Sequence, residues 1–389
     1  MSTKYVISAD SHIIEPLDLW TKALARKHPI EKLPRVVKRD DAIKGDYYWS
    51  GIEYLKLNLF DPVDSTDSTG QVASFERELA AKVKRCSVDP AVRVELMDYD
   101  GISAEIINST YMLLNMRMAD SNVLKDVCTV YNDWLAEHCS HNPKRLLGAA
   151  MIDLRDPAWA TRELERIAKK GLRTAIVQNA IAPQYPPYRR SVYDPFWAAA
   201  QDLDMPITLH AITGTVRDPF TYHTPEELEL APASFIDIFN DIGAIVTQEF
   251  IFGRIFDRFP KLRIIFGEYE VSWLPMFMFR LKQVEGAFGR SLNLAPLKCS
   301  VVEYMSTRVW HTFVDDPYID RAYDIPGANQ IIWGSDFPHI RNTFPKTHAI
   351  LDRILAKLPA KAQADISALT AARLFDIELP KEAYAVAAE

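Results

Sequence analysis

Short apolar segments alternate with helical segments along most of the chain, and this alternation constrains the fold more than any other feature. The apolar segments have the length of β-strands, and the segments between them carry apolar residues at helical spacing. We predict strands at residues 5–7, 104–107, 146–151, 174–177, 206–210, 262–266, 308–313 and 330–333. Strands that alternate with helices form a parallel sheet, and eight such units are the number in a closed barrel. The sequence therefore predicts an α/β fold, the (β/α)8 TIM barrel. A doubly wound open sheet is the alternative, but it would have a glycine-rich turn after the first strand, and none is present.

Residues 30–75 interrupt this alternation. The stretch is too long for a plain connection, so we interpret it as an insertion or lid after the first helix, which we predict at 17–27. A solvent-exposed excursion with a small hairpin fits equally well. Two extra helices, at about 348–358 and 361–374, follow the last strand. We find no internal repeat and expect a single domain over residues 1–389.

Composition excludes several classes of function. The net charge is −7, which leaves no basic surface for nucleic acid. The four cysteines form no C-x-x-C pair, so neither a disulfide framework nor a zinc knuckle is expected. The N-terminus has no apolar leader, and no run of eighteen apolar residues could span a membrane. We expect a soluble cytoplasmic protein.

Side chains that could bind a metal gather where four of the predicted strands end. They are Asp10 and His12 after the first strand, His210 at the end of the fifth, Glu268 and Glu270 after the sixth, and Asp336 and His339 after the eighth. In a TIM barrel these strand ends share one rim, where the chemistry takes place. Asp10 alone could instead cap the helix that Pro16 opens. Four strand ends carrying histidine or carboxylate favour a metal site.

The ligand types narrow the choice of metal. Carboxylates mixed with imidazoles suit Fe, Mn or catalytic Zn. Asp10, Glu268, Glu270 and Asp336 carry enough negative charge for two divalent ions, about 3.5–4 Å apart. If the sixth strand continues through Glu270, both glutamates face the barrel interior, because residues two apart share a face. Alternatively, Glu270 begins the next helix as a cap.

Further residues are candidates for supporting roles. His339 could act as an acid, a base or a ligand, and His311 could point into the barrel from the seventh strand. Glu15 is either a partner of a metal ligand or an acid at a helix terminus. Aromatic residues in loops could flank the mouth and favour a large, partly apolar substrate, or merely pack the loops: Tyr47, Tyr48, Trp49, Tyr185, Tyr188, Phe220 and Tyr222.

Four motifs together resemble a known family. They are S-A-D-S-H-I-I-E-P at the start, T-L-H at His210, F-P-K-L-R-I-I-F-G-E-Y-E-V-S-W-L-P from Phe259, and W-G-S-D-F-P-H from Trp333. The chain resembles the amidohydrolase-related group that includes aminocarboxymuconate-semialdehyde decarboxylase and related aromatic-acid decarboxylases. The resemblance implies a distorted TIM barrel with a divalent metal at the strand tips. It also implies Asp10, His12, His210 and Asp336 as ligands.

One departure from that family decides our functional expectation. Its decarboxylases and many of its hydrolases carry a histidine at the end of strand six, where this chain has Glu268 with Glu270 beside it. The E-x-E-x-x-W pattern resembles a branch that holds two irons and activates O2. We therefore expect a nonheme diiron monooxygenase that hydroxylates a largely apolar terpenoid or acyl-CoA-type substrate.

This oxygenase would use Asp336, His339 and Glu268 in catalysis. Its six metal ligands would be Asp10, His12, His210, Glu268, Glu270 and Asp336, and its partners a small-molecule substrate and an electron-donor reductase. We expect a homo-oligomer. The alternatives are a hydrolase of an amide, ester or lactone with one Zn or Mn, and a non-oxidative decarboxylase of an aromatic acid.

Overall fold

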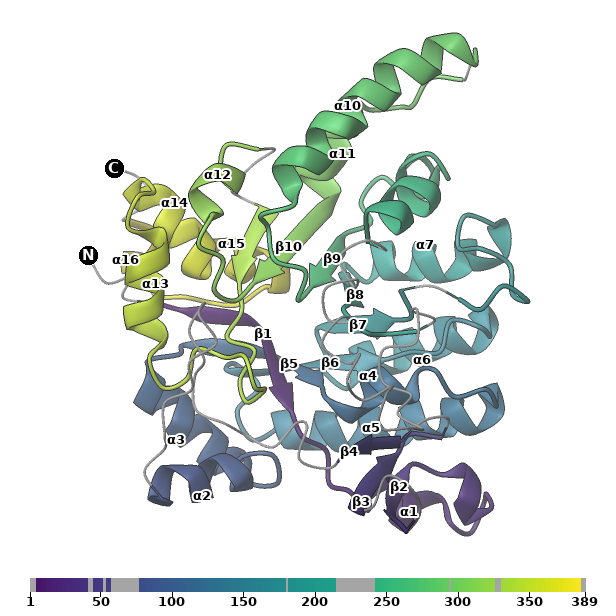
Figure 1. Ribbon diagram of the computed structural model, residues 1–389, viewed down its shortest axis with the longest axis vertical. Coiled ribbons are helices and arrows are strands. Elements are labelled where there is room, and N and C mark those ends of the chain that lie inside the picture. Colours follow the sequence, from purple (N-terminus) through teal and green to yellow (C-terminus); the bar gives the residue numbers. More distant parts are fainter. Residues whose placement is uncertain are drawn as a thin grey trace.

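Eight parallel strands form the centre of the molecule, with helices around them (Figure 1). The computed structural model describes residues 5–40, 45–51, 54–56, 77–179, 181–214, 242–293, 295–325 and 330–385. The barrel strands follow one another in chain order: β1 (Ile7–Ile13), β5 (Ala104–Ser109), β6 (Leu146–Met151), β7 (Thr174–Val177), β8 (Ile207–His210), β9 (Ile264–Gly267), β10 (Val309–Phe313) and β11 (Ile331–Trp333). Each strand pairs in parallel with the next, which confirms the predicted (β/α)8 barrel.

The barrel closes between its last and first strands through single hydrogen bonds instead of a regular ladder. The Asp336 amide donates to the Asp10 carbonyl at 2.8 Å, and the His12 amide donates to the Phe337 carbonyl at 2.7 Å. The Ser335 amide donates to Ser8 Oγ at 2.9 Å. These bonds fix the loop after β11 against β1, so residues far apart in sequence share one end of the barrel.

Strand β1 is longer than predicted and more polar than a barrel strand normally is. All seven of its residues are buried, although Ser8, Asp10, Ser11 and His12 are polar. Its pairing with β5 shifts by one residue between Ser8 and Ser11, which is a β-bulge. Burying polar side chains costs free energy unless each finds a partner, so this strand points to function.

The helices pack outside the strands, and several begin at an aspartate that caps them. The Asp89, Asp120 and Asp156 carboxylates accept amide hydrogens of the first turns of their helices, which stabilises those turns. The described helices are α1 (Leu19–Leu24), α2 (Arg77–Arg85), α3 (Pro90–Asp100), α4 (Tyr111–Asn115), α5 (Ser121–Cys139), α6 (Pro157–Lys169), α7 (Asp194–Asp202), α9 (Ile255–Arg258), α10 (Leu274–Ser291), α11 (Val301–Arg308), α12 (Ile319–Ala322), α13 (Thr347–Leu355), α14 (Ala360–Ala364), α15 (Thr370–Phe375) and α16 (Lys381–Ala385). Short 3-10 or π-helical segments are η1 (Ile30–Lys32), η3 (Ser191–Tyr193), η4 (Val246–Ile251) and η6 (Asp365–Leu369). No described helix is long and apolar enough to cross a membrane.

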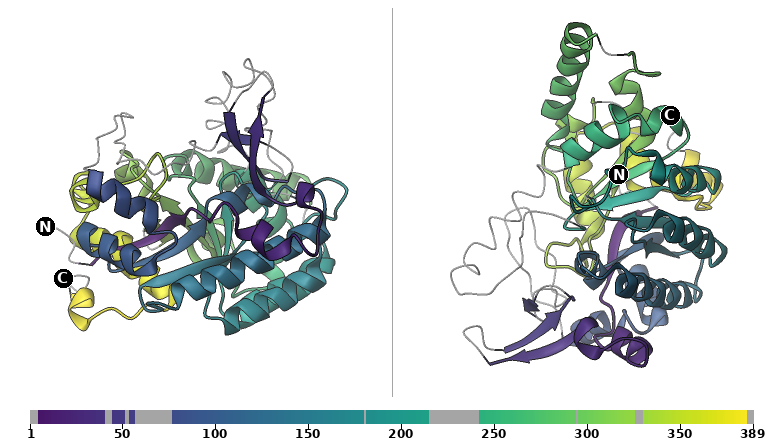
Figure 2. Two further views of the ribbon diagram at one scale, coloured as in Figure 1. Left: turned by 90° about the horizontal axis from the view of Figure 1, so that it is seen from below. Right: turned by 90° about the vertical axis from the view of Figure 1, so that its right-hand side faces the viewer.

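The stretch expected to be an insertion holds a small antiparallel sheet that projects from the barrel (Figure 2). Its strands are β2 (Arg35–Arg39), β3 (Gly45–Trp49) and β4 (Tyr54–Lys56), and residues 57–76 lie outside the described part. Tyr48 is fully buried, stacks on Tyr111 of α4 and donates its hydroxyl hydrogen to Asn115. This contact anchors the small sheet to the barrel.

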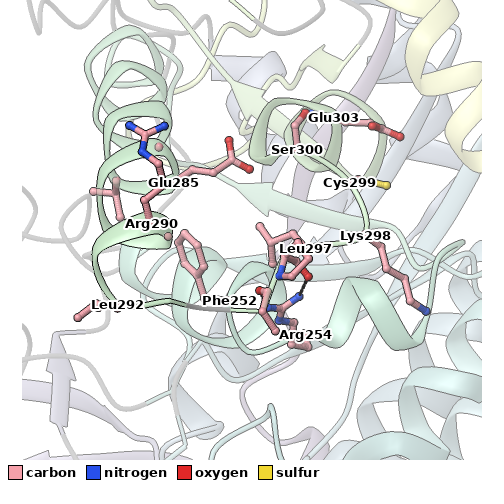
Figure 3. Close-up of a pocket in the computed structure, with 15 residues that line it drawn as sticks. Phe252, Arg254, Glu285, Arg290, Leu292, Leu297, Lys298, Cys299, Ser300 and Glu303 are labelled. Carbon is pink, nitrogen blue, oxygen red and sulfur yellow. Dashed lines mark hydrogen bonds between the residues drawn. The ribbon is translucent and has the colours of Figure 1, made fainter.

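Helix α10 projects away from the barrel with α11 packed beside it (Figure 1). A cavity of about 820 Å³ lies between these helices and the turn at Phe252 and Arg254 (Figure 3). Phe252, Leu292 and Leu297 give it a largely apolar wall, and Arg290 and Glu303 lie at its edge.

Candidate metal centre

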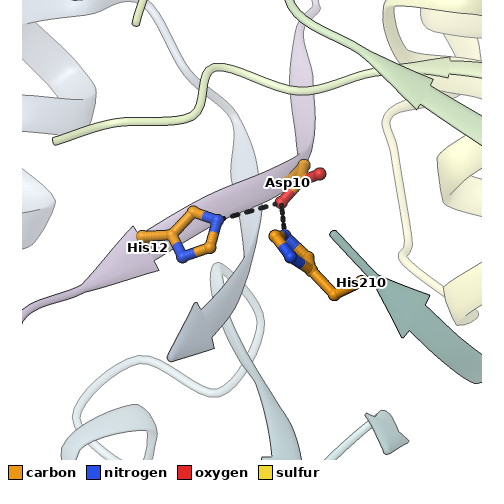
Figure 4. Close-up of side chains that lie close together, drawn as sticks. All are labelled: Asp10, His12 and His210. Atoms are coloured by element: carbon orange, nitrogen blue, oxygen red, sulfur yellow. Dashed lines mark hydrogen bonds and ion pairs between the residues drawn. The ribbon is translucent and has the colours of Figure 1, made fainter. Parts of the chain in front are cut away.

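Asp10, His12 and His210 meet inside the barrel, and all three side chains are fully buried. Figure 4 shows both imidazoles approaching one oxygen of Asp10, His12 from the same strand and His210 from β8. His12 Nε2 and His210 Nε2 each lie 3.3 Å from Asp10 Oδ1. These atoms are close enough together to hold one metal ion.

Side chains from β5 and β10 hold the Asp10 carboxylate in place. Asn108 Nδ2 of β5 donates to Asp10 Oδ1 at 2.6 Å, and Thr312 Oγ1 of β10 donates to Asp10 Oδ2 at 2.7 Å. Burial acts to raise the pKa of Asp10, but His210 and His12 outweigh it and hold that pKa well below its usual value. Burial acts in turn to lower the pKa of His210, yet Asp10 raises it to about 9. Asp10 is therefore a fixed carboxylate.

The backbone of β5 and Glu15 orient the His12 ring. His12 Nδ1 lies 2.6 Å from the Ser109 carbonyl oxygen, so the ring proton belongs on Nδ1 and Nε2 carries a lone pair. Ser109 Oγ donates to the fully buried Glu15 carboxylate, which also accepts the Tyr111 and Met112 amides at the start of α4. Glu15 is thus an acid at a helix N-terminus, and it contacts Ser109, whose carbonyl meets His12, but not His12 itself.

Asp336 and His339 extend the cluster on the other side of His12. Asp336 Oδ1 lies 3.4 Å from His12 Nε2 and 2.9 Å from His339 Nδ1. The rings of His339 and His12 stack with centroids 3.9 Å apart, and Thr110 Oγ1 lies 2.9 Å from His339 Nε2. Burial, aided by the charge on Asp10, raises the pKa of Asp336 to about 7, while burial lowers the pKa of His339 to about 3. These three residues form a second set of close potential ligands.

Two buried polar atoms at the centre of the cluster have no hydrogen-bond partner among the described residues. His12 Nε2 is buried and makes no hydrogen bond in the described part of the chain, and the same holds for Asp336 Oδ1. An imidazole lone pair faces carboxylate oxygens of Asp10 and Asp336 there, and such an arrangement is repulsive without positive charge. A divalent metal fits this donor set, because imidazole and carboxylate are its common ligands.

Two glycines make room for this packing. A side chain at Gly334 would place its Cβ 2.3 Å from the Cβ of Asp10. A side chain at Gly267 would place its Cβ 2.7 Å from the His210 ring. The backbone at the ends of β9 and β11 can therefore approach the ligands only because these two residues are glycines.

The two glutamates after β9 do not both face the barrel interior. That arrangement was expected only if the strand continued through Glu270. The strand ends at Gly267, and both glutamates have positive φ, 64° at Glu268 and 53° at Glu270. Glu268 Oε2 lies 3.7 Å from His210 Nδ1, beside the cluster. Glu270 Oε1 instead pairs with Arg341 at 2.5 Å. Neither glutamate belongs to the close ligand sets found among the described residues.

Other expected residues lie elsewhere. His311 faces outward against the rings of Phe266 and Trp273, so the expectation that it could point into the barrel is wrong. The Thr312 side chain points inward in its place. Phe220 and Tyr222 lie outside the described residues. Tyr48 and Tyr188 are buried, so they pack the loops and do not line an open mouth.

The residues that hold the ligands in place were given no role in the prediction from sequence. Asn108, Thr110 and Thr312 are uncharged, and their only signal is a polar residue at the end of a buried strand. Arg93 is fully buried, pairs with Glu105 at 2.6 Å and donates to the His12 carbonyl at 2.7 Å. Its sequence position within α3 gave no sign of this contact. The cavity beside α10 is lined by none of the candidate ligands.

Comparison with known proteins places the chain in one family and shows the same fold in solved structures. The amidohydrolase family model matches residues 88–377. Gamma-resorcylate decarboxylase of Polaromonas sp. is 30% identical over 257 residues, which are 63% of this chain and 76% of that protein. An amidohydrolase structure from Mycobacterium avium subsp. paratuberculosis has a TM-score of 0.74 at 19% identity and covers 95% of this chain and 99% of its own. A 5-carboxyvanillate decarboxylase of Novosphingobium aromaticivorans, solved with bound manganese, has a TM-score of 0.67 at 20% identity and covers 96% of this chain and 97% of its own.

These comparisons correct the functional expectation. The prediction of a diiron monooxygenase is wrong, and so are the assignments to iron and oxidoreductase chemistry, because the matching relatives are decarboxylases. The geometry gives the physical reason: Arg341 neutralises Glu270, so the acid expected to bind a second ion is already paired. The expectation of an electron-donor reductase rests on the oxygenase alone. The alternative of a non-oxidative decarboxylase agrees better with these relatives.

Proposed function

The chain belongs to the amidohydrolase family, and on that premise we propose that it is a metal-dependent decarboxylase of an aromatic carboxylic acid. The relative from Polaromonas sp., named for gamma-resorcylate, supports the reaction and the class of substrate. The observation that carries the proposal is the convergence of the His12 lone pair with the Asp10 and Asp336 carboxylates inside the barrel.

We assign one divalent ion to Asp10, His12, His210 and Asp336. Manganese or zinc suits a set of two imidazoles and two carboxylates. The manganese bound in the 5-carboxyvanillate decarboxylase supports the first choice. When bound, such an ion acts as a Lewis acid that draws electron density from an oxygen of the substrate.

The residues around the ion supply the proton that the reaction needs. The bond between the ring carbon and the carboxylate breaks, CO2 leaves, and the electron pair stays on the ring carbon, where a proton takes its place. Asp336 would deliver that proton, because its Oδ1 lies in the cluster and 2.9 Å from His339 Nδ1. His339 is buried and neutral, and its ring lies beside the Asp336 carboxyl. Besides Asp336, Glu268 is a second carboxyl at this rim of the barrel, where it lies beside His210.

A decarboxylation assay with defined metal tests the proposal. Protein stripped with a chelator and reloaded with Mn2+ or Zn2+ is incubated with hydroxybenzoic acids, 2,6-dihydroxybenzoate and 5-carboxyvanillate among them, and released CO2 is measured. We expect CO2 only from the metal-loaded protein, and a loss of at least about 100-fold in kcat for Asp336→Asn, the usual size of a general-acid contribution. Hydrolysis of esters or lactones with no CO2 from any acid would overturn it in favour of the hydrolase alternative.

A further inference from the structure

Arg93 of α3 places a fully buried guanidinium group against the metal-binding part of β1. Its Nε donates to Glu105 Oε1 at 2.6 Å and its Nη2 to Glu105 Oε2 at 3.0 Å, which is the forked pairing that arginine forms with carboxylates. Nη1 donates to the His12 carbonyl at 2.7 Å, and Nη2 donates to Ser11 Oγ at 3.1 Å. A longer contact of 3.9 Å joins Nη1 to Cys86 Sγ. A guanidinium group has five N–H donors, so these five contacts use all of them.

This ion pair holds β1 at its bulge. Ser8 pairs with Glu105 of β5, but Ser11 pairs with Ile107, so β1 has one extra residue between these two points. A bulge changes the direction of the side chains around it. Ser11 Oγ donates to Glu105 Oε2 at 3.0 Å and also accepts from the arginine, so both members of the ion pair bind the residue that lies between the two ligands of β1.

Arg93 also contacts the loop that carries Asp336. The central carbon of its guanidinium group lies 5.0 Å from the centre of the Phe337 ring, which is a cation–π contact. Phe337 follows Asp336 directly, and its carbonyl accepts the His12 amide at 2.7 Å. Arg93 therefore joins the two segments that carry three of the four assigned ligands.

Stability alone does not account for a buried ion pair. Taking both charges out of water costs free energy, and replacing such a pair with apolar residues of similar volume is often neutral or stabilising. An apolar pair could not, however, donate hydrogen bonds to the His12 carbonyl and Ser11 Oγ. We propose that Arg93, paired with Glu105, is a positioning residue that holds β1 and the Asp336 loop in the geometry of the metal site before the ion binds. This inference rests on the ion assigned under the proposed function.

A double substitution separates positioning from stability. Arg93→Met combined with Glu105→Met leaves no unpaired charge buried, so the protein should keep its fold and melt like the wild type. Its affinity for Mn2+, measured by equilibrium dialysis, should fall by about 10–100-fold, the usual effect of losing a residue that orients a ligand. In the metal-free protein, backbone amides of residues 8–14 should exchange with D2O faster than in the wild type, because the strand opens locally more often.

The ion pair between Arg166 and Glu163 of α6 is the matched control. It has the same fork, with both hydrogen bonds at 2.7 Å, and Glu163 is buried. Among the described residues it makes no hydrogen bond to β1 or to an assigned ligand. Arg166→Met combined with Glu163→Met should leave both Mn2+ affinity and the exchange of residues 8–14 unchanged. Arg93→Lys keeps the charge and loses the fork, so its Mn2+ affinity should lie between those of the wild type and the Arg93 double variant.

Wild-type Mn2+ affinity in the folded Arg93 double variant would overturn the inference, and so would an equal loss in the control. If the double variant does not fold, Ser11→Ala decides, because it removes one contact of Arg93 and keeps the ion pair. It should weaken Mn2+ binding by about tenfold, and an unchanged affinity would overturn the inference.

The proposed reaction can fail independently of the positioning role. CO2 release by the wild type together with unchanged Mn2+ affinity in the Arg93 double variant refutes the positioning role alone. Loss of Mn2+ by that variant, with no CO2 from any acid in the wild type, supports the positioning role and refutes the reaction. A wild type that binds no Mn2+ or Zn2+ overturns both.

Discussion

The ends of β1 and β9 carry the same kind of sequence pattern and produce different sites. Asp10-Ser11-His12 and Glu268-Tyr269-Glu270 each place two potential ligands two residues apart. At β1 the strand continues to Ile13, and both ligands face the barrel interior, where their side chains lie 3.3 Å apart. At β9 the strand ends at Gly267, and the two glutamates diverge.

The difference shows that spacing predicts a shared face only where the backbone stays extended. Ser11, between the two ligands of β1, hydrogen-bonds to Glu105 on the opposite side, as alternation requires. Glu268 and Glu270 both have positive φ, so the backbone there is not extended and their side chains do not share a face as in a strand. One carboxylate lies near His210 and the other near Arg341. If this comparison is correct, substitutions at β1 should affect metal binding far more than those after β9.

The largest effect is expected at His12. His12→Ala removes a ligand that the Ser109 carbonyl holds in one orientation, and it should weaken metal binding by more than about 100-fold, beyond the 10–100-fold typical of supporting residues. Equilibrium dialysis against buffered Mn2+ measures this. A folded His12→Ala protein that binds Mn2+ with wild-type affinity would show that His12 of β1 is not a metal ligand.

Asp100 is a second buried aspartate, and its pKa is shifted in the direction opposite to that of Asp10. Asp100 bonds to the Thr347 amide and hydroxyl, and burial raises its pKa to about 7, whereas in an unfolded chain it is near 3.9. The folded protein therefore keeps this proton between about pH 4 and 7 after the unfolded chain has released it, so stability falls as the pH rises through that window.

Asp100→Asn should consequently gain stability relative to the wild type from pH 4 to pH 7, by roughly 2 kcal/mol once relaxation around the charge is allowed for. Urea unfolding at both pH values measures the change. A constant difference between the two proteins would contradict it, and would weaken the claim that the histidines beside Asp10 keep that residue charged.

A smaller effect is expected at Glu268. Its carboxylate lies 3.7 Å from His210 Nδ1, outside the close ligand sets, so Glu268→Gln should weaken Mn2+ binding by no more than about tenfold, the low end for a supporting residue. Metal loss equal to that of His12→Ala would instead make Glu268 a ligand and break the comparison.

The smallest effect on the metal is expected at Glu270. Glu270→Gln breaks a partly exposed ion pair, which should cost about 1 kcal/mol of stability or less and leave Mn2+ affinity within about twofold of wild type. Dialysis and thermal melting on the same samples give both numbers. A large loss of metal would show that Glu270 binds an ion after all.

The sequence was sufficient for the barrel and for bringing Asp10, His12, His210 and Asp336 to one rim, because strand alternation and motif positions are local signals. It was not sufficient for Glu270, whose partner Arg341 comes from a different loop, or for the end of β9, where Gly267 and positive φ stop the strand. The reaction was also out of reach, since one set of carboxylates and imidazoles supports several metals and several chemistries.

Anomalous diffraction from crystals grown with Mn2+ and a hydroxybenzoate tests the metal assignment most directly. The expected result is one manganese per chain, bonded to Asp10, His12, His210 and Asp336, with the aromatic ring beside the ion. Two ions, or a single ion bonded to Glu268 and Glu270, would contradict it.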